Sequence, residues 1–476
     1  MRACIQVIQP RLVGALVLSL LVGCSLAPSY ERPPAPVPEM WTDGTQGQAS
    51  SDTAPRLDWQ YFVEDQSLRH LIDLALANNR DLRQTLLNVE AAKAQYRIQR
   101  ADRLPHVSLD ATATRQRVGE SSAVESSYQV GIGLTAFELD LFGRVRNLSE
   151  ASLEEYLATE RAGHSAEISL VAEVVQAFLT RDGAQHRYAI ATQSLEARET
   201  SLTLLAQLRA RGFINELDYQ EAIGLRDQVK ADRERIDREF RQSSNALSLL
   251  VGVSNASELL PKVYSDRLLL VQEIPPGTPS TLLMRRPDIR SAEHQLKARN
   301  ASIGAARAAF FPRISLTGSL GSSSPELSGL FGSGTRTWLF TPQIVLPILS
   351  GGANRANLDL AYVRKDIAVA AYEYSIQVAF REVSDALAAT DTLRREEIAL
   401  AEAAVASGNA MLLSEARYRG GLDDHLRFLD AQRTDYSSQI AWIEIHTQRQ
   451  IALSTLFRAL GGGWRGELSR DVVSVR

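Results

Sequence analysis

Two segments in each half of the chain alternate between apolar and polar residues with a period of two. In the first of them Val107, Leu109 and Ala111 share one face, while Ser108 and Asp110 share the other. Side chains of a strand point to opposite faces in turn, so this pattern predicts a β-strand. The matching segments are Tyr128–Leu139, Ile314–Leu320 and Trp338–Leu346, and the first of these three places Val130, Ile132, Leu134 and Ala136 on one face.

Each alternating segment has roughly ten residues, the length of a tilted strand that crosses a membrane. Polar loops rich in glycine and serine join the segments in pairs. We therefore expect two β-hairpins, at 106–140 and 313–348, each preceded by one helix, over 68–103 and over 289–309. The prolines Pro105 and Pro312 should mark the entry into the strands, because a residue before proline resists the helical conformation.

A very long helical stretch follows each hairpin. In 145–211 the apolar residues recur on one stripe, as Ile168, Val171 and Val175 do, and 353–419 has the same length. No proline interrupts either stretch. At 1.5 Å per residue each would measure about 100 Å, far more than an ordinary globular helix. We expect these helices to pack as a coiled coil or bundle.

Glycine ends each long stretch. The first stops at Gly212 and the second at Gly420 and Gly421, and a further helical segment follows in both cases. A glycine in the left-handed conformation closes a helix in this way. The sequence therefore predicts a helical hairpin with a glycine turn in each half.

The chain is one unit used twice. A shift of 207 residues carries Pro105 onto Pro312, and a shift of 209 carries Gly212 onto Gly421. Prolines and glycines that stay in register over so long a span indicate a tandem duplication. The predicted organisation is a signal peptide at 1–23, an extended N-terminal segment at 24–64, a first repeat at 65–252, a linker at 253–279, a second repeat at 280–463 and a tail at 464–476.

The N-terminus has the form of a lipoprotein signal. Arg2 and Arg11 precede the apolar run 12–22, and small residues precede Cys24. The run is too short for a membrane-spanning helix and fits a cleaved secretory signal. Leu21–Cys24 resembles the bacterial lipobox, which implies that Cys24 is acylated and becomes the mature N-terminus. The residue after it is Ser25 and not aspartate, which implies sorting to the outer membrane.

Composition excludes several classes of protein. The 52 basic and 56 acidic residues give a net charge of -4, which does not favour nucleic-acid binding. Two cysteines and seven scattered histidines predict neither a disulfide scaffold nor a metal site. No pairing of nucleophile and base is apparent, so we expect no enzyme and no cofactor beyond the lipid on Cys24.

Four strands per chain are too few to span a membrane alone. The smallest membrane barrels have about eight strands, and open edges are not tolerated in lipid. The chain should therefore assemble with copies of itself around a symmetry axis. The same symmetry would gather the long helices into a tube that continues the barrel.

The sequence resembles the TolC-like outer-membrane efflux proteins, especially their lipoprotein branch. The resemblance covers essentially the whole mature chain. It implies an α+β membrane protein: a homotrimer with a shared 12-stranded β-barrel, continued by a periplasmic α-helical barrel. It also implies an exit duct for drugs and other toxic compounds, joined by a periplasmic adaptor to an inner-membrane transporter of the resistance-nodulation-division type. The most specific motifs are Tyr30–Pro33, Glu138–Arg144, Arg285–Arg290, Ala305–Gly318 and Leu429–Arg433.

The resemblance further implies a periplasmic gate just after the second glycine turn. The matching positions are Leu426, Asp430 and Arg433 on one helix face, with Tyr418 nearby. Threefold symmetry would repeat Leu426 as an apolar ring and Asp430 as an acidic ring. Some family channels carry a second acid three residues before Asp430, where this chain has Arg427. The alternatives are a solvated helix start, where acids are favoured, and a merely packed Tyr418.

Two other functions remain open from the sequence. The channel could serve a type I exporter of proteins, although the lipobox argues against that. Alternatively, the chain could be a tethered coiled-coil lipoprotein that does not span the membrane, although such a scaffold would not need the two alternating hairpins.

Overall fold

The computed structural model describes residues 25–38, 58–117, 124–260, 269–274 and 285–462. They divide into two compact units, each built from three separate segments. Unit 1 comprises residues within 25–35, 88–161 and 290–375, and unit 2 comprises residues within 36–87, 162–289 and 376–462. Four helices have residues in both units: α4 (Arg80–Ala101), α5 (Arg144–Ala210), α8 (Pro287–Ala308) and α9 (Ala353–Arg419).

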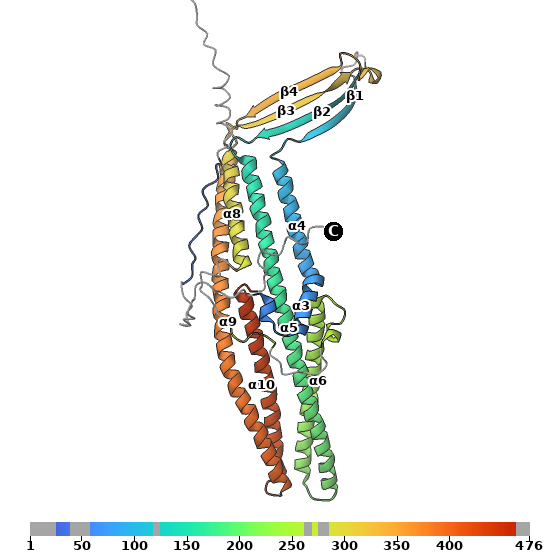
Figure 1. The fold of residues 1–476 in the computed structure, drawn as a ribbon, viewed down its shortest axis with the longest axis vertical. Helices are drawn as coiled ribbons and strands as arrows, with labels where there is room; N and C mark the ends of the chain where they lie inside the picture. Colours follow the sequence, from blue (N-terminus) through green and yellow to red (C-terminus); the bar gives the residue numbers. More distant parts are fainter. Residues whose placement is uncertain (1–24, 39–57, 118–123, 261–268, 275–284, 463–476) are drawn as a thin grey trace, which may run out of the picture. The chain divides into compact units, whose positions relative to one another are not determined.

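Unit 1 contains a four-stranded antiparallel sheet in the order β1-β2-β3-β4 (Figure 1). The strands are β1 (Val107–Gln116), β2 (Glu125–Leu139), β3 (Arg313–Ser324) and β4 (Arg336–Val345). The central pair, β2 with β3, joins the hairpin of the first half to that of the second. Within the described chain β1 and β4 each have one neighbour, so each presents a row of unpaired backbone groups at an edge.

One face of this sheet is apolar across all four strands. The register aligns Leu109, Ile132, Leu320 and Trp338 in a single row. These four side chains are between 57% and 78% exposed within the chain. The adjacent row on the opposite face contains Ser108, Gly133, Ser319 and Leu339, so this face is polar on β1 to β3 and carries one leucine on β4. An exposed apolar face backed by a polar one suits a sheet with lipid on one side and water on the other.

A β-bulge corrects the predicted alternation in β2. Leu134 pairs with Gly318, but the next partner on β3, Leu316, faces Phe137 and not Ala136. Ala136 adopts a positive φ of 51°, and its N–H donates to the Thr317 hydroxyl at 3.1 Å. The prediction that Ala136 continues the apolar face was wrong. The bulge inserts one extra residue, so Phe137 and not Ala136 lies on that face.

Helix α3 (Gln66–Asn78) and α4 replace the single helix predicted over 68–103. The break lies at Asn79, whose side chain accepts a hydrogen bond from the Leu82 N–H at 2.8 Å and donates to the Leu250 carbonyl at 2.9 Å. Asparagine is a favoured helix N-cap. The uniform helical pattern of the sequence hid this cap, so the prediction of one helix was wrong.

The core of unit 2 gathers aliphatic and aromatic side chains from both halves of the chain. Phe62 of α2 (Trp59–Phe62) stacks on Phe457 of α10 (His425–Ala459), with ring centroids 4.2 Å apart. Around them lie side chains of α3, α5 and α6 (Glu216–Val251). Because Phe457 is only 1% exposed, removing its ring would leave a large cavity.

The two long helices α5 and α9 each contain 67 residues without interruption. Each is followed by a short turn and a second helix, α6 or α10. Across the part of the chain that the structure describes, no helix combines the length and apolar character needed to cross a membrane. The four strands, the long helices and the repeated order of elements agree with the predicted fold.

Candidate gate and anchor sites

The turn between α9 and α10 contains the predicted gate region. Gly421 adopts a positive φ of 68°, a conformation that is strained for a residue with a side chain but not for glycine. Asp424 then caps α10, because its carboxylate accepts the Arg427 N–H at 3.0 Å. In the first half, Gly212 has a φ of 76° at the corresponding turn, and Asn215 caps α6 through the Asp218 N–H.

The structure places Asp430 and Arg433 one turn apart on α10. Arg433 Nη2 donates to Asp430 Oδ1 at 2.5 Å, so the pair forms within one helix. Both side chains are about three-fifths exposed, at 59% for Asp430 and 61% for Arg433. An exposed ion pair of this kind is worth only ~0.2–1 kcal/mol. It is thus a contact that a small energy could break.

Leu426 and Tyr418 have different surroundings. Leu426 is 52% exposed, so its side chain is available to another surface. The Tyr418 ring instead lies against His425 and Phe428, with centroids 4.8 and 5.8 Å away. Burial raises the pKa of Tyr418, and the nearby Asp218 carboxylate adds to that effect.

An acidic centre that the sequence analysis missed lies in the same turn. Asp423 accepts two hydrogen bonds from Arg417, at 2.6 and 2.9 Å, and Arg427 lies 3.7 Å away. The Arg417 hydrogen bonds hold the pKa of Asp423 below its ordinary value. Arg427, which stands where some family channels have a second acid, therefore has Asp423 as a local partner. The signal in the sequence was an arginine and an aspartate flanking the glycine pair.

The tips of the two helical hairpins share a small apolar cluster. Leu205 of α5, Ala222 of α6 and Leu429 of α10 are all buried there. Leu429 lies beside Asp430 in the sequence, so the position of the gate segment depends on its contact with the first hairpin. The tip of α10 is thus packed on one side and exposed on the other.

The N-terminal residues 25–33 run along α8 as an extended strap. Arg307 donates to the Leu26 carbonyl at 3.0 Å, and Asn300 donates to the Pro28 carbonyl at 2.8 Å. Arg307, Asn300 and Glu293 are spaced seven residues apart, so they lie on one stripe of the helix over about 21 Å. Six residues of extended chain span about 20 Å, which matches that stripe.

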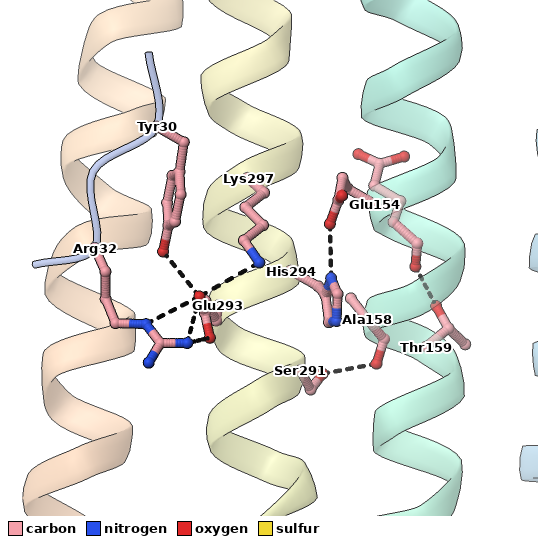
Figure 2. A network of polar contacts seen from close by, with 10 residues as sticks. Tyr30, Arg32, Glu154, Ala158, Thr159, Ser291, Glu293, His294 and Lys297 are labelled. Atoms are coloured by element: carbon pink, nitrogen blue, oxygen red, sulfur yellow. Dashed lines mark hydrogen bonds and ion pairs between the residues drawn. The ribbon is translucent and has the colours of Figure 1, made fainter. Parts of the chain in front are cut away.

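Figure 2 shows the lower end of the strap, where Tyr30 and Arg32 converge on Glu293. Arg32 Nη2 lies 2.7 and 2.9 Å from the two carboxylate oxygens, and the Tyr30 hydroxyl donates at 3.2 Å. Lys297 Nζ approaches the same carboxylate at 3.3 Å. Burial alone would raise the pKa of Glu293, but Arg32 and Lys297 together hold it below its ordinary value. The carboxylate is therefore charged at neutral pH and fastens the strap.

Removing the charge of Glu293 should loosen the strap. Glu293→Gln replaces charge-assisted hydrogen bonds with weaker neutral ones. We expect residues 25–33 to be cleaved by a nonspecific protease roughly tenfold faster, the factor that corresponds to ~1.4 kcal/mol. Because the pKa of Glu293 is lowered on docking, the unaltered strap should hold at neutral pH and release only below the free glutamate value of about 4.3.

Limited proteolysis of the purified protein checks this, with the exposed Glu150→Gln of α5 as the matched control. Equal cleavage rates in both variants would show that Glu293 does not fasten the strap.

The predicted lipidation site, Cys24, lies outside the described residues, as do the signal peptide and the C-terminal tail. Its neighbour Ser25 donates to the Asn147 side chain at 2.9 Å, only a few residues after the start of α5. Pro105 and Pro312 immediately precede β1 and β3, within two residues. Among the described residues, no group of three or more side chains is placed to hold a metal ion.

Comparison with known proteins identifies the family. The family model described as "Outer membrane efflux protein" matches residues 71–253 and 278–462. Outer membrane protein OprJ of Pseudomonas aeruginosa is 57% identical over 459 residues, which cover 95% of this chain and 96% of that protein. The toluene efflux pump outer membrane protein TtgC of Pseudomonas putida is 43% identical, over 94% of this chain and 95% of TtgC.

Solved structures agree with the sequence relatives. The crystal structure of a membrane protein from Pseudomonas aeruginosa has a TM-score of 0.87 and 57% identity, covering 93% of this chain and 98% of that one. The open state of the MtrE outer membrane channel of Neisseria gonorrhoeae has a TM-score of 0.84 and 38% identity, covering 92% and 98%. These matches confirm the resemblance drawn from the motifs, and the two matched ranges confirm the duplication. Proteins of this family are transport channels and not enzymes, and the chain belongs to the outer membrane efflux protein family.

Proposed function

We propose that three copies of this chain form a passive duct through the outer membrane, the exit channel of a tripartite pump for antibiotics, solvents and other toxic small molecules. The observation that carries this proposal is the four-stranded sheet, with its apolar face and two unpaired edge strands. Pairing β1 of one copy with β4 of the next removes every edge and closes twelve strands into a barrel.

The names of the relatives support the kind of cargo. TtgC is called a toluene efflux pump protein, and ArpC of Pseudomonas putida, 43% identical to this chain, an antibiotic efflux pump protein. Both names describe pump components, so a periplasmic adaptor and an inner-membrane transporter of the resistance-nodulation-division type are the partners we infer. A protein cargo delivered by a type I exporter is the less favoured alternative.

We also infer that Cys24 carries a lipid anchor in the outer membrane of a Gram-negative bacterium. The strap supports this inference, because it fixes Ser25 beside Asn147, eight residues after the end of β2. A single acyl chain binds a membrane only marginally, whereas several chains together with a barrel would hold firmly. The repeat boundaries proposed from the sequence, 65–252 and 280–463, leave the strap outside both repeats.

The periplasmic gate is assigned to Leu426, Asp430, Arg433 and Tyr418 at the tip of α10. The exposed Leu426 would close the axis as an apolar ring, and the Asp430–Arg433 pairs would surround it. We expect the double variant Asp430→Ala with Arg433→Ala to raise the resting conductance several-fold. Each exposed pair is worth ~0.2–1 kcal/mol, and the symmetry repeats the loss three times.

Single-channel recording in planar bilayers measures this effect. The control is Asp391→Ala with Arg394→Ala, which removes another exposed pair with the same spacing on α9, together with the Asp391–Arg395 contact. An unchanged conductance in the first double variant, or an equal rise in the control, would refute the gate assignment.

The same recordings test the proposed function itself. The purified protein should conduct ions as a trimer, and deleting its gene should sensitise the cell to several unrelated drugs. A protein without conductance would instead match the tethered coiled-coil lipoprotein. A deletion that abolishes secretion of one protein and leaves drug susceptibility unchanged would favour the type I exporter.

A further inference from the structure

A buried histidine lies at the centre of the proposed gate. His425 is the first residue of α10, and only 6% of it is exposed. Its ring lies against those of Tyr418 and Phe428, with centroid distances of 4.8 and 6.0 Å, and the three rings form one cluster. The next residue in the chain is Leu426. The position of this imidazole is therefore coupled directly to the segment that would close the channel.

Neither ring nitrogen of His425 has a hydrogen-bond partner among the described residues. Buried polar groups are normally satisfied, and each exception requires an explanation. Two unpaired nitrogens within an aromatic cluster destabilise the closed tip, because water would form hydrogen bonds with both of them if the tip opened. The hairpin does not need a histidine at this position in order to fold, because Gly421 forms the turn and Asp424 caps the helix.

The charges around His425 come from two elements. Asp218 and Glu221 approach from α6, and Asp424 precedes it at the cap of α10. Burial lowers the pKa of His425, and the three carboxylates only partly oppose that effect. The positive end of the α10 dipole also disfavours a cation at this position. Tyr418, the titratable group that faces it from α9, stays neutral because its own pKa is raised.

We propose that His425 is a proton-binding site that opens the periplasmic end of the channel in acid. In the conformation of the tip described above, which this proposal assigns to the closed channel, the imidazole is neutral and packed against aromatic rings. Protonation places a cation in that enclosure, and the cation gains water or the α6 carboxylates only if the α9–α10 tip moves. This inference rests on the proposed gate, since it names the group that controls the same segment.

The direction follows from linkage. A base whose pKa is lower in the closed form binds a proton more readily when the tip is open. The closed tip is therefore fully stable above the free imidazole value of about 6.5 and loses stability as the pH falls below it. Reciprocally, opening the tip by other means must raise the proton affinity of His425.

The Asp423 carboxylate should respond to pH in a different range. Asp423 is held ionised by Arg417 and stays charged until the pH is well below the histidine range. Asp430 is paired with Arg433 on an exposed face. A response between about pH 7.5 and about pH 5.5, the range that brackets an ordinary imidazole, therefore distinguishes His425 from Asp423.

The test compares channel conductance in planar bilayers at these two pH values. In the unaltered protein we expect a several-fold increase on acidification. His425→Phe keeps a ring against Tyr418 and Phe428 but cannot titrate, so its conductance should stay low at both values. His425→Gln, a polar side chain without a proton equilibrium in this range, should also show no response to pH.

The outcomes separate this inference from the proposed gate. If both His425 variants open on acidification as the unaltered channel does, His425 is not the proton site, and the inference fails. If the unaltered channel does not respond to acid but the Asp430→Ala, Arg433→Ala variant conducts more, the inference also fails while the gate stands. If neither acid nor that double variant changes the conductance, the gate assignment itself is wrong.

Discussion

Leu320→Arg is expected to prevent assembly of the channel in the membrane, whereas Ser319→Arg on the adjacent residue is expected to be tolerated. Leu320 lies near the middle of β3, in the apolar row with Ile132 and Trp338, and is 67% exposed within the chain. An arginine on the lipid face of a barrel costs ~2–4 kcal/mol near the bilayer midplane. A trimer would incur this cost three times.

Ser319 provides the matched control, because it is also exposed but points to the opposite face of the same strand. On that face an arginine would extend into the water-filled lumen, where it changes selectivity and not stability. The measurement is the amount of heat-modifiable trimer in outer-membrane fractions. Equal trimer yields for the two variants would contradict the assignment of the apolar face to lipid.

Gly304→Val is expected to displace the N-terminal strap from α8. A Cβ at position 304 would lie 2.7 Å from the Ala27 backbone nitrogen and 2.4 Å from the Asn147 amide. The Asn147 side chain can rotate away, but the strap backbone must move, and the hydrogen bonds of Leu26 and Pro28 to the helix would be lost with it. The loss should exceed that in Glu293→Gln, which removes a single fastening point.

Gly224→Val on α6 is the control, because nothing lies within 4 Å of a Cβ built there. We expect residues 25–33 to be cleaved as fast in Gly304→Val as in an unstructured chain, while the control resembles the unaltered protein. The barrel and the helices should remain assembled in both variants. A strap that stays protected in Gly304→Val would show that its path along α8 is not fixed by this glycine.

The fold could be predicted from the sequence where periodicity carried the information. Period two marked the strands, and glycine or proline marked their ends and those of the long helices. The bulge at Ala136 and the cap at Asn79 were not predicted. Each interrupts a strand or helix at a single residue and leaves the average pattern of apolar and polar positions unchanged. Each of the two residues also makes a hydrogen bond to a distant partner, Thr317 for Ala136 and Leu250 for Asn79, which the local sequence does not reveal.

The candidate sites could be predicted less completely. Leu426, Asp430 and Arg433 were assigned to the gate through helix spacing and family resemblance, and their role stays a prediction. Their neighbours Asp423 and His425 were not assigned, because an ion pair across a turn and a buried imidazole leave no periodic trace. The strap was missed for a similar reason, since Glu293 meets Tyr30 and Arg32 across more than 260 residues of sequence.

The mass of the purified particle in mild detergent tests the central claim most directly. Four strands with two free edges cannot seal a cylinder within one chain, and the proposed barrel has twelve strands, so light scattering with the detergent contribution subtracted should give three copies of the chain per particle. A stable particle that contains one copy would contradict the account, because such a particle could not close a barrel.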